Sequence, residues 1–207
     1  MAEAVPAAGA PRVSRLDRRK ARTRQALIDA AVRLIAEGRG DRASIAEITE
    51  EADIGFGSFY NHFDSKEALA VVALERYWES RGIEDLADRS VAPLARLRSH
   101  FESLRARTEG HGFTRGCLIG NFGAEVADHS DVLRAAVGQS LARWVELITE
   151  VLAEAQQAGS LRSGLDPQAT ARFVLSAWEG TLILARADRS GAAFDSFFDL
   201  VFGTLLT

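Results

Sequence analysis

The chain has 207 residues and a mass of 22.4 kDa, and its 47% hydrophobic and 26% charged residues are ordinary for a globular protein, which excludes extensive disorder. Its one cysteine, Cys117, excludes a disulfide framework and a cysteine-rich metal site, and no apolar run approaches the roughly 20 residues of a membrane helix. We therefore expect a cytoplasmic protein without a metal, a cofactor or a membrane partner.

The net charge conceals a basic N-terminus. Residues 1–24 hold seven basic side chains and two acids, a local balance of +5 within a total of −4, so the remaining chain carries −9. A basic arm on an acidic body indicates contact with a polyanion, and a solvated tail is the alternative interpretation. We expect residues 1–17 to form a flexible basic arm.

Apolar residues recur at helical spacing from about Arg18 onward. They fall on one face of a helix: Leu27, Ala30, Ala31, Leu34 and Ile35. Gly38 and Gly40 provide the stop, so the first helix is expected to end near them.

A second, short helix is expected to open at Ile45. Ser44 and Glu47 have the spacing of a capping box, in which the serine hydroxyl and the glutamate carboxylate satisfy free amides at the helix start. This helix should stop near Asp53, because aspartate tolerates the left-handed turn that most residues resist.

A third short helix is expected over Phe56 to Phe63. Phe59 and Phe63 are four residues apart and form its buried pair, while Asp64 and Ser65 offer caps for the helix that follows. That following helix continues to Tyr77 and Trp78.

Three short helices joined by tight turns are the elements of a helix-turn-helix unit, whose last helix enters the major groove of DNA. Asn61 can pair with adenine, Ser58 with several bases, and Phe56 can contact a thymine methyl group. Lys66 lies at a helix start, where its charge and the free amides both favour a phosphate. The alternative interpretation of this aromatic stretch is a small core cluster.

The rest of the chain also reads at helical period, and no alternating strand pattern appears, so the fold class is all-α. Further helices are expected at roughly 90–108, 117–127, 130–158, 167–186 and 192–206. The Asp166-Pro167 pair is a strong start signal for the fourth of these helices.

Three consecutive stretches carry a resemblance to a known family. They read A-L-I-D-A-A-V-R-L-I-A-E, S-I-A-E-I-T-E-E-A-D-I and G-F-G-S-F-Y-N-H-F-D-S-K-E-A-L. Together they closely resemble, over about Arg18 to Leu69, the N-terminal domain of the TetR family of bacterial transcriptional repressors. The resemblance implies a helix-turn-helix DNA-binding domain at residues 18–64 and a larger helical ligand-binding and dimerisation domain at residues 65–207.

The resemblance also implies roles for individual positions. The positions that face DNA bases in the family correspond here to Phe56, Gly57, Ser58 and Asn61. The positions that hold phosphates in the family correspond to Tyr60, His62 and Lys66. Thr23 and Ser44 correspond to family residues at helix starts that meet the DNA backbone. Arg19, Arg22 and Arg24 lie where family members use a basic arm to contact phosphates or the minor groove. This chain departs from the family at Asp53, where glycine is usual, and at Gly55, where a capping residue is usual, so the third helix is expected to be less tightly capped.

The last two helices resemble the family's dimer interface, a four-helix bundle shared between two subunits. Its expected residues are Ala177, Thr181, Leu184, Phe194, Phe197, Phe198, Val201 and Phe202. An ordinary core within one chain is the alternative explanation of this apolar stripe. A dimer would place two third helices at the spacing of a palindromic operator.

The stretch G-C-L-I-G-N around Cys117 resembles, more weakly, a branch of the family that responds to small electrophiles such as N-ethylmaleimide or acrylate. At a helix start the pKa of the thiol could be lowered, which would make Cys117 a reactive sensor, or the side chain is a small buried hydrophobe. An apolar ligand cavity is expected, with walls from Phe101, Leu104, Phe113, Cys117, Asn121, Phe122, Glu125, Trp144, Phe173 and Trp178.

The predicted function is a dimeric DNA-binding regulator, a repressor released from a palindromic operator by a small-molecule inducer. One alternative is a thiol-based electrophile or redox sensor acting through Cys117, and another is a constitutive DNA-binding regulator without an inducer. An enzyme using Cys117 with His100 or His111 is disfavoured, because no nucleophile elbow, phosphate loop or zinc motif is present.

Overall fold

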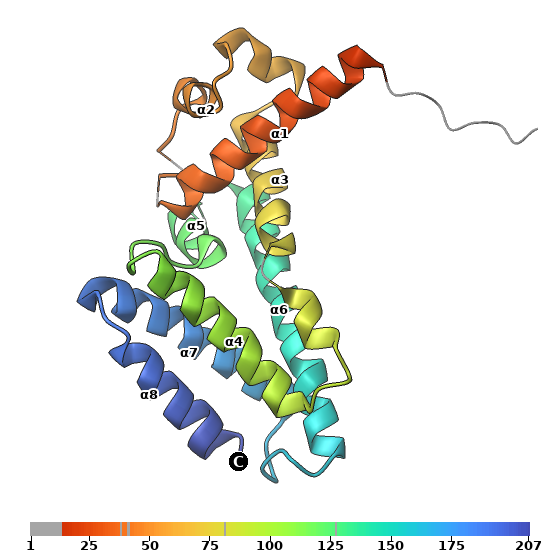
Figure 1. Ribbon diagram of the computed structural model, residues 1–207, viewed down its shortest axis with the longest axis vertical. Helices are drawn as coiled ribbons and strands as arrows, with labels where there is room; N and C mark the ends of the chain where they lie inside the picture. The colour runs from red at the N-terminus through yellow and green to blue at the C-terminus, as the bar shows by residue number, and fades with distance from the viewer. Residues whose placement is uncertain (1–13, 38, 41, 81, 127) are drawn as a thin grey trace, which may run out of the picture.

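The computed structural model describes residues 14–207 apart from residues 38, 41, 81 and 127. Within these ranges every regular element is a helix, as expected from the sequence. The molecule is elongated, with a small group of helices at one end and a larger bundle at the other (Figure 1). In the described part of the chain, no helix is both long enough and apolar enough to span a bilayer.

The smaller group, which we call the head, consists of α1 (Arg15–Ala36), α2 (Ile45–Glu51) and η1 (Phe56–Asn61). The expected apolar face of α1 is buried, with Leu27 and Ala30 fully inaccessible to solvent. Helix α1 begins at Arg15, so residues 15–17 of the expected flexible arm are the first turn of a helix, capped by Ser14. The rest of that arm lies outside the described residues, as does Gly38.

Two local predictions for the head are confirmed. Ser44 and Glu47 form the complete capping box at the start of α2. Asp53 adopts the left-handed conformation, with a φ of 54°, and so turns the chain between α2 and η1.

The third helix differs from the expectation in type and length. Element η1 is a 3₁₀-helix of six residues, and Gly55, the residue before its first turn, offers no side-chain cap. The missing cap agrees with the departure from the family pattern at Gly55. Phe59 and Phe63 are the buried pair, with 0% and 5% of their surfaces exposed and ring centroids 6.0 Å apart.

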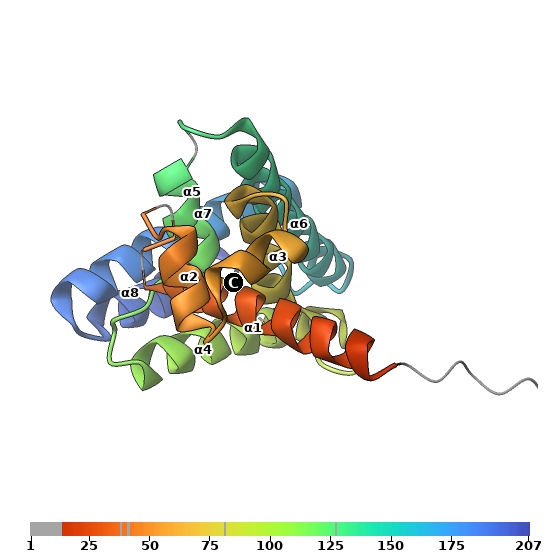
Figure 2. The ribbon, with the colours of Figure 1, turned by 90° about the horizontal axis from the view of Figure 1, so that it is seen from above.

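Helix α3 (Lys66–Glu79) joins the head to the larger bundle. The Ser65 hydroxyl caps it by accepting a hydrogen bond from the Ala68 amide. Seen from above, α3 lies between α1 and α6, and it packs against both (Figure 2). Helix α3 is therefore in contact with both the head and the larger bundle.

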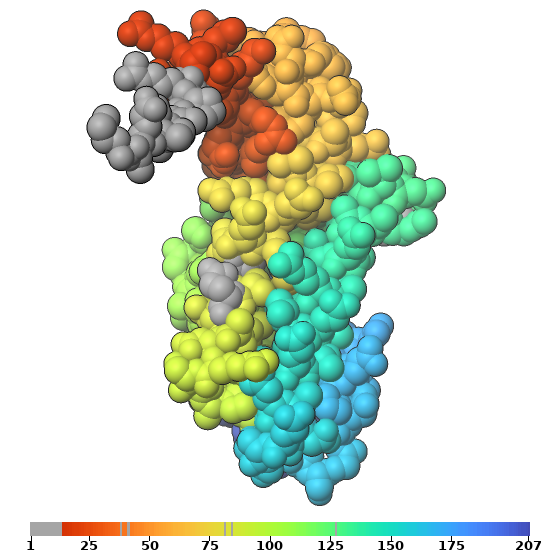
Figure 3. All heavy atoms as spheres, turned by 90° about the vertical axis from the view of Figure 1, so that its right-hand side faces the viewer, coloured from red at the N-terminus to blue at the C-terminus, as the bar shows by residue number. Residues whose placement is uncertain are grey.

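The larger bundle, which we call the body, contains the remaining elements. These are η2 (Ile83–Ala87), α4 (Pro93–Gly110), α5 (Leu118–Val126), α6 (Asp131–Gln157), α7 (Pro167–Asp188), α8 (Ala192–Leu200) and η3 (Val201–Leu205). Helix α6 runs along one side of the molecule from near the head to the far end (Figure 3). Asp166 caps α7 as expected. The sequence did not indicate the short 3₁₀-helix η2, which follows Gly82 in the left-handed conformation at a φ of 67°.

An aromatic core holds the body together. Phe101 of α4, Trp178 of α7 and Phe197 of α8 have ring centroids 5.0–5.2 Å apart. All three side chains are at most 4% exposed. Burial of such large side chains contributes several kcal/mol to the stability of the bundle, so α8 is firmly part of the same chain's core.

Candidate nucleic-acid interface

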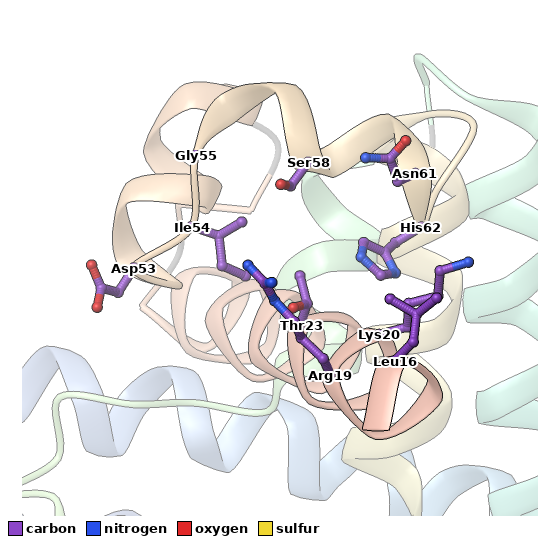
Figure 4. Close-up of a pocket in the computed structure, with 10 residues that line it drawn as sticks. All are labelled: Leu16, Arg19, Lys20, Thr23, Asp53, Ile54, Gly55, Ser58, Asn61 and His62. Atoms are coloured by element: carbon purple, nitrogen blue, oxygen red, sulfur yellow. The ribbon is translucent and has the colours of Figure 1, made fainter. Parts of the chain in front are cut away.

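A polar groove crosses the outer surface of the head between α1 and η1 (Figure 4). It has a volume of about 630 Å³. Its lining residues are Leu16, Arg19, Lys20, Thr23, Asp53, Ile54, Gly55, Ser58, Asn61 and His62. The groove brings together five of the predicted DNA-binding residues, three from η1 and its end and two from α1: Ser58, Asn61, His62, Arg19 and Thr23.

The two walls of this groove differ in chemistry. Helix α1 supplies the cations of Arg19 and Lys20, whereas η1 supplies the hydroxyl of Ser58 and the amide of Asn61 (Figure 4). The carboxylate of Asp53 points outward at the rim rather than into the groove. This arrangement can hold phosphates on one side and present neutral donors and acceptors to base edges on the other.

Two large aromatic side chains project from η1 beside the groove. Phe56 is 55% exposed and Tyr60 is 57% exposed, and their rings meet edge to face at 6.5 Å. Although the Tyr60 ring also packs edge to face on Phe59, the described chain leaves more than half of each of the two side chains uncovered. Gly57 lies between them with open space around it, so another molecule can approach the backbone closely.

The other predicted DNA-binding residues lie outside the groove. Arg24 stacks over the ring of Phe63, with its guanidinium carbon 4.9 Å from the ring centroid. The Lys66 ammonium donates to the carbonyl of Ala43 at 3.3 Å. The Ser44 hydroxyl serves the capping box, and Arg22 is exposed on α1 away from the lining set.

The expected dimer residues need a correction. Five of them are buried against the rest of their own chain, with no more than 9% of their surfaces exposed: Phe194, Phe197, Phe198, Val201 and Phe202. Thr181 is also buried, and its hydroxyl donates to the carbonyl of Ala177. For these residues the alternative explanation, an intrachain core, is the right one, because α8 packs onto α4 and α7.

A different apolar face of α7 and α8 is exposed. Phe173, Ile183 and Leu184 of α7 are 59%, 65% and 56% exposed, and Leu200 of α8 is 64% exposed. On α7 the accessible positions also include Gly180 and recur at helical spacing, so they form one stripe. Of the predicted interface, Leu184 lies on this stripe and Ala177 is half-buried beside it.

A small cavity lies in the body near the residues predicted to line a ligand site. It has a volume of about 20 Å³, enough for roughly one water molecule. Its lining residues are Tyr77, Leu104, Thr108, Gly116, Cys117, Trp144, Trp178 and Leu182. Four of these were expected, whereas Tyr77 and Thr108 were missed because their spacing fits ordinary helix cores.

The remaining expected wall residues do not line this cavity. Phe101 and Phe122 are buried in the surrounding core, and Phe113 and Glu125 are only partly buried. Phe173 is corrected outright, because it is exposed on the outer stripe of α7. Asn121 lies next to the cavity wall at Gly116, where its Oδ1 accepts a hydrogen bond from Arg186 at 3.1 Å.

The environment of Cys117 opposes a reactive thiolate. Burial raises the pKa of the thiol strongly, and the neighbouring carboxylate of Glu179 raises it further. Cys117 precedes α5, but the lowering effect of the helix start is smaller than these two contributions. The thiol is therefore protonated at neutral pH, which contradicts the idea of a helix start that lowers its pKa.

Glu179 is the main residue that the sequence did not indicate. Burial raises the pKa of its carboxyl group to about 7, and the hydrogen bond from the Cys117 thiol only partly opposes this rise. Its Oε1 is buried and has no hydrogen-bond partner. The sequence gives no signal that Glu179 is buried, because its contact with Cys117 joins α7 to the residue before α5, far apart in the chain.

Comparisons with known proteins agree with this geometry. A family model described as "Bacterial regulatory proteins, tetR family" matches residues 27–73, and one described as "Tetracyclin repressor-like, C-terminal domain" matches residues 93–201. The chain is 34% identical to the HTH-type transcriptional repressor DhaR of Mycobacterium sp. (strain GP1), over 88% of this chain and 92% of DhaR.

Solved structures show the same fold. The regulatory protein TetR from Rhodobacter sphaeroides superposes with a TM-score of 0.82 at 32% identity, covering 89% of this chain and 99% of that one. The reduced form of Escherichia coli NemR superposes with a TM-score of 0.80 at 25% identity, covering 89% and 98% of the two chains.

Proposed function

The chain belongs to the TetR family of bacterial DNA-binding transcriptional regulators, and on this premise we propose that it is a dimeric repressor that leaves a palindromic operator when a small molecule enters its body. Its relatives are regulators rather than enzymes, and both DhaR and NemR are named as repressors. We propose the division of the chain into a DNA-binding head at residues 18–64 and a ligand-binding, dimerising body at residues 65–207.

The observation that carries the proposal is the two-sided groove of the head. Arg19 and Lys20 on α1 would hold phosphates, while Ser58 and Asn61 on η1 would contact base edges in the major groove. The exposed ring of Phe56 would contact a thymine methyl group, and Tyr60 would reach a phosphate with its hydroxyl. Lys66, Thr23, His62 and the arm residues Arg22 and Arg24 would add further contacts to the DNA backbone.

The dimer would form through the exposed stripe of α7 and the adjacent face of α8. Phe173, Leu184 and Leu200 together expose a large apolar surface, which is unusual for a free helix face in water. A two-fold axis through this stripe would pack α7 and α8 against their copies as a four-helix bundle. Two heads would then face DNA at a fixed spacing, as a palindromic site requires.

Inducer release would depend on α3, which connects the cavity to the head. Tyr77 of α3 lines the cavity, and its hydroxyl accepts a hydrogen bond from the Leu118 amide at 3.1 Å. A ligand larger than one water must displace this wall, and α3 would carry the movement to α1. A second connection is the ion pair between Arg115 and Glu37 at 3.7 Å, which joins the loop before Cys117 to the end of α1.

Thiol sensing through Cys117 is the alternative to a reversible inducer. It is supported by the resemblance around Cys117 and by the likeness to NemR, whose structure is described as a reduced form. The raised pKa of the Cys117 thiol weighs against it, because a protonated thiol is a poor nucleophile. We therefore assign Cys117 to the cavity wall. A ligand that changes operator affinity by at least tenfold would exclude a constitutive regulator.

Two alanine substitutions in the groove are expected to have different consequences for DNA binding. Asn61→Ala should cost about 1–3 kcal/mol on the preferred sequence and relax the preference at one base pair, because it removes a base contact. Arg19→Ala should weaken binding to all sequences alike and reduce the salt slope by about 1, because it removes a phosphate contact.

Binding of each variant to operator and to scrambled duplex across a salt series provides the measurement. Arg89→Ala serves as the control, because this arginine lies in the body and its side chain is 79% exposed. An equal loss on both duplexes for Asn61→Ala would remove Asn61 from the base contacts. An unchanged salt slope for Arg19→Ala would remove Arg19 from the phosphate contacts.

A further inference from the structure

A buried polar cluster lies beside the interior cavity, where α5 meets α7. In the described part of the chain, three buried side-chain nitrogen or oxygen atoms lack a hydrogen-bond partner, and two of them belong to this cluster: Asn121 Nδ2 and Glu179 Oε1. The carboxylate of Glu179 contacts Cys117, which lines the cavity. Unpartnered buried polar atoms are costly, so their presence at a cavity indicates an incomplete binding site.

In the part of the chain that the structure describes, Glu179 has no cationic partner in this cluster. Within the described residues, no lysine, arginine or histidine forms an ion pair with Glu179, and the nearby Arg186 donates to Asn121 instead. A buried carboxylate normally has a cationic partner, because desolvation of an unpaired charge is expensive. Glu179 receives only the weak donor of the Cys117 thiol.

The cavity on the other side of Cys117 has aromatic and apolar walls. Tyr77, Trp144 and Trp178 line the cavity, together with Leu104 and Leu182. The faces of tryptophan and tyrosine attract organic cations, and the leucines can contact an alkyl chain. The combination of one unpaired acid with several aromatic walls is suited to a ligand that is cationic at one end and apolar at the other.

We infer that the body binds a small amphipathic amine, whose ammonium group pairs with Glu179 and whose apolar part lies against Trp144, Trp178 and Leu182. This inference rests on the proposed function, since it gives the chemical class of the inducer. A cavity of about 20 Å³ cannot hold such a molecule without outward movement of its walls, and one of those walls is Tyr77 of α3. Amine binding would therefore be coupled to the position of the head.

The glycine at position 120 makes room for the acid. A methyl group added at Gly120 would overlap the carboxylate of Glu179, whereas a methyl group at Gly138 of α6 would meet no atom within 4 Å. The two positions provide a matched pair of glycine-to-alanine variants, of which only one displaces Glu179 from its contact with Cys117.

Amine binding should depend on pH through Glu179. The pKa of this carboxyl group is raised to about 7 in the free protein, and pairing with an ammonium group favours the ionised form. Affinity for the amine should therefore fall as the pH decreases below about 7. Four other ionisable side chains lie around Glu179 and the cavity: Cys117 before α5, Arg186 of α7, Tyr77 of α3 and His100 of α4. His100 accepts a hydrogen bond from Trp144, which lines the cavity.

The test is calorimetric titration of the full-length protein with n-butylamine and with its neutral analogue n-butanol between pH 6 and pH 8. We expect the amine to bind at least tenfold more tightly than the alcohol at pH 8, and Glu179→Gln to remove both this preference and the pH dependence. Gly120→Ala should weaken amine binding as well, while Gly138→Ala should not. Thermal unfolding of each variant checks that it is folded.

Equal affinities for amine and alcohol, no amine binding, or an amine affinity unchanged in Glu179→Gln would each overturn the inference. Operator binding by the same protein preparation without ligand is measured in parallel. Failure of operator binding would contradict the proposed function whatever the calorimetry shows. Failure of amine binding alone would leave the DNA-binding function in place and remove only this ligand class.

Discussion

Replacing Leu184 with glutamate is expected to split the dimer and to lower operator affinity by at least ~100-fold, equivalent to about 3 kcal/mol. Leu184 is 56% exposed and lies on the apolar stripe of α7. In a two-fold symmetric interface each substitution occurs twice, so two carboxylates would be desolvated close together without a cationic partner. A monomer would contact only one half-site and would lose the contribution of the second head.

Sedimentation equilibrium and operator titration on the same samples provide the measurement. Val132→Glu is the matched control, because Val132 is also 56% exposed but lies in the first turn of α6, where a negative charge is tolerated. A dimer that persists in Leu184→Glu would show that the stripe is not the interface, whatever happens to DNA binding.

The second large effect is expected from Phe59→Ala, which should lower the free energy of unfolding of the head by about 3–5 kcal/mol. The Phe59 side chain is fully buried and contacts Phe63 and Tyr60. A cavity left in so small a helical head cannot be refilled by neighbouring side chains, so η1 should lose its orientation. DNA binding should then be lost together with head stability.

Chemical denaturation followed by circular dichroism, together with operator titration, measures both consequences. Phe56→Ala is the informative comparison, because Phe56 is 55% exposed and its removal should change stability by no more than about 0.5 kcal/mol while weakening DNA binding. A loss of less than about 1 kcal/mol in Phe59→Ala would contradict the packing role of Phe59.

The head could be predicted well because its signals are local. The Ser44–Glu47 capping box, the left-handed Asp53 and the buried pair of Phe59 and Phe63 each depend on residues close in sequence. The 3₁₀ geometry of η1 was not predicted, because the difference between 3₁₀ and α hydrogen bonding leaves little trace in so short a stretch.

In the body, the sequence pattern predicted which helix faces are apolar but not what covers them. The stripe of phenylalanines on α8 correctly indicated a buried face, but periodicity does not say whether the covering surface belongs to the same chain or to a second one. In the structure Phe101 and Trp178 of the same chain cover the phenylalanine face of α8. The exposed face of α8 is a different one, which carries Leu200. Which surface packs against a helix face depends on the tertiary structure, and periodicity alone does not give it.

The same limitation explains the errors at the cavity. A thiol pKa lowered by a helix start was one of two interpretations of Cys117, and burial and Glu179 instead raise the pKa of this thiol. Nothing in the sequence around Glu179 indicates that its carboxylate lies in the space left by Gly120. These residues come from different helices, and only the packing of α5 against α7 brings them together.

The central claim, that the chain is a dimeric operator reader, is tested most directly by selecting the full-length protein against random duplex DNA and following the binding of the selected sequences across a salt series. We expect an inverted repeat whose half-sites are separated by about one helical turn or a multiple of it, bound with steep salt dependence. Enrichment of a single half-site, or of no consensus at all, would contradict the claim.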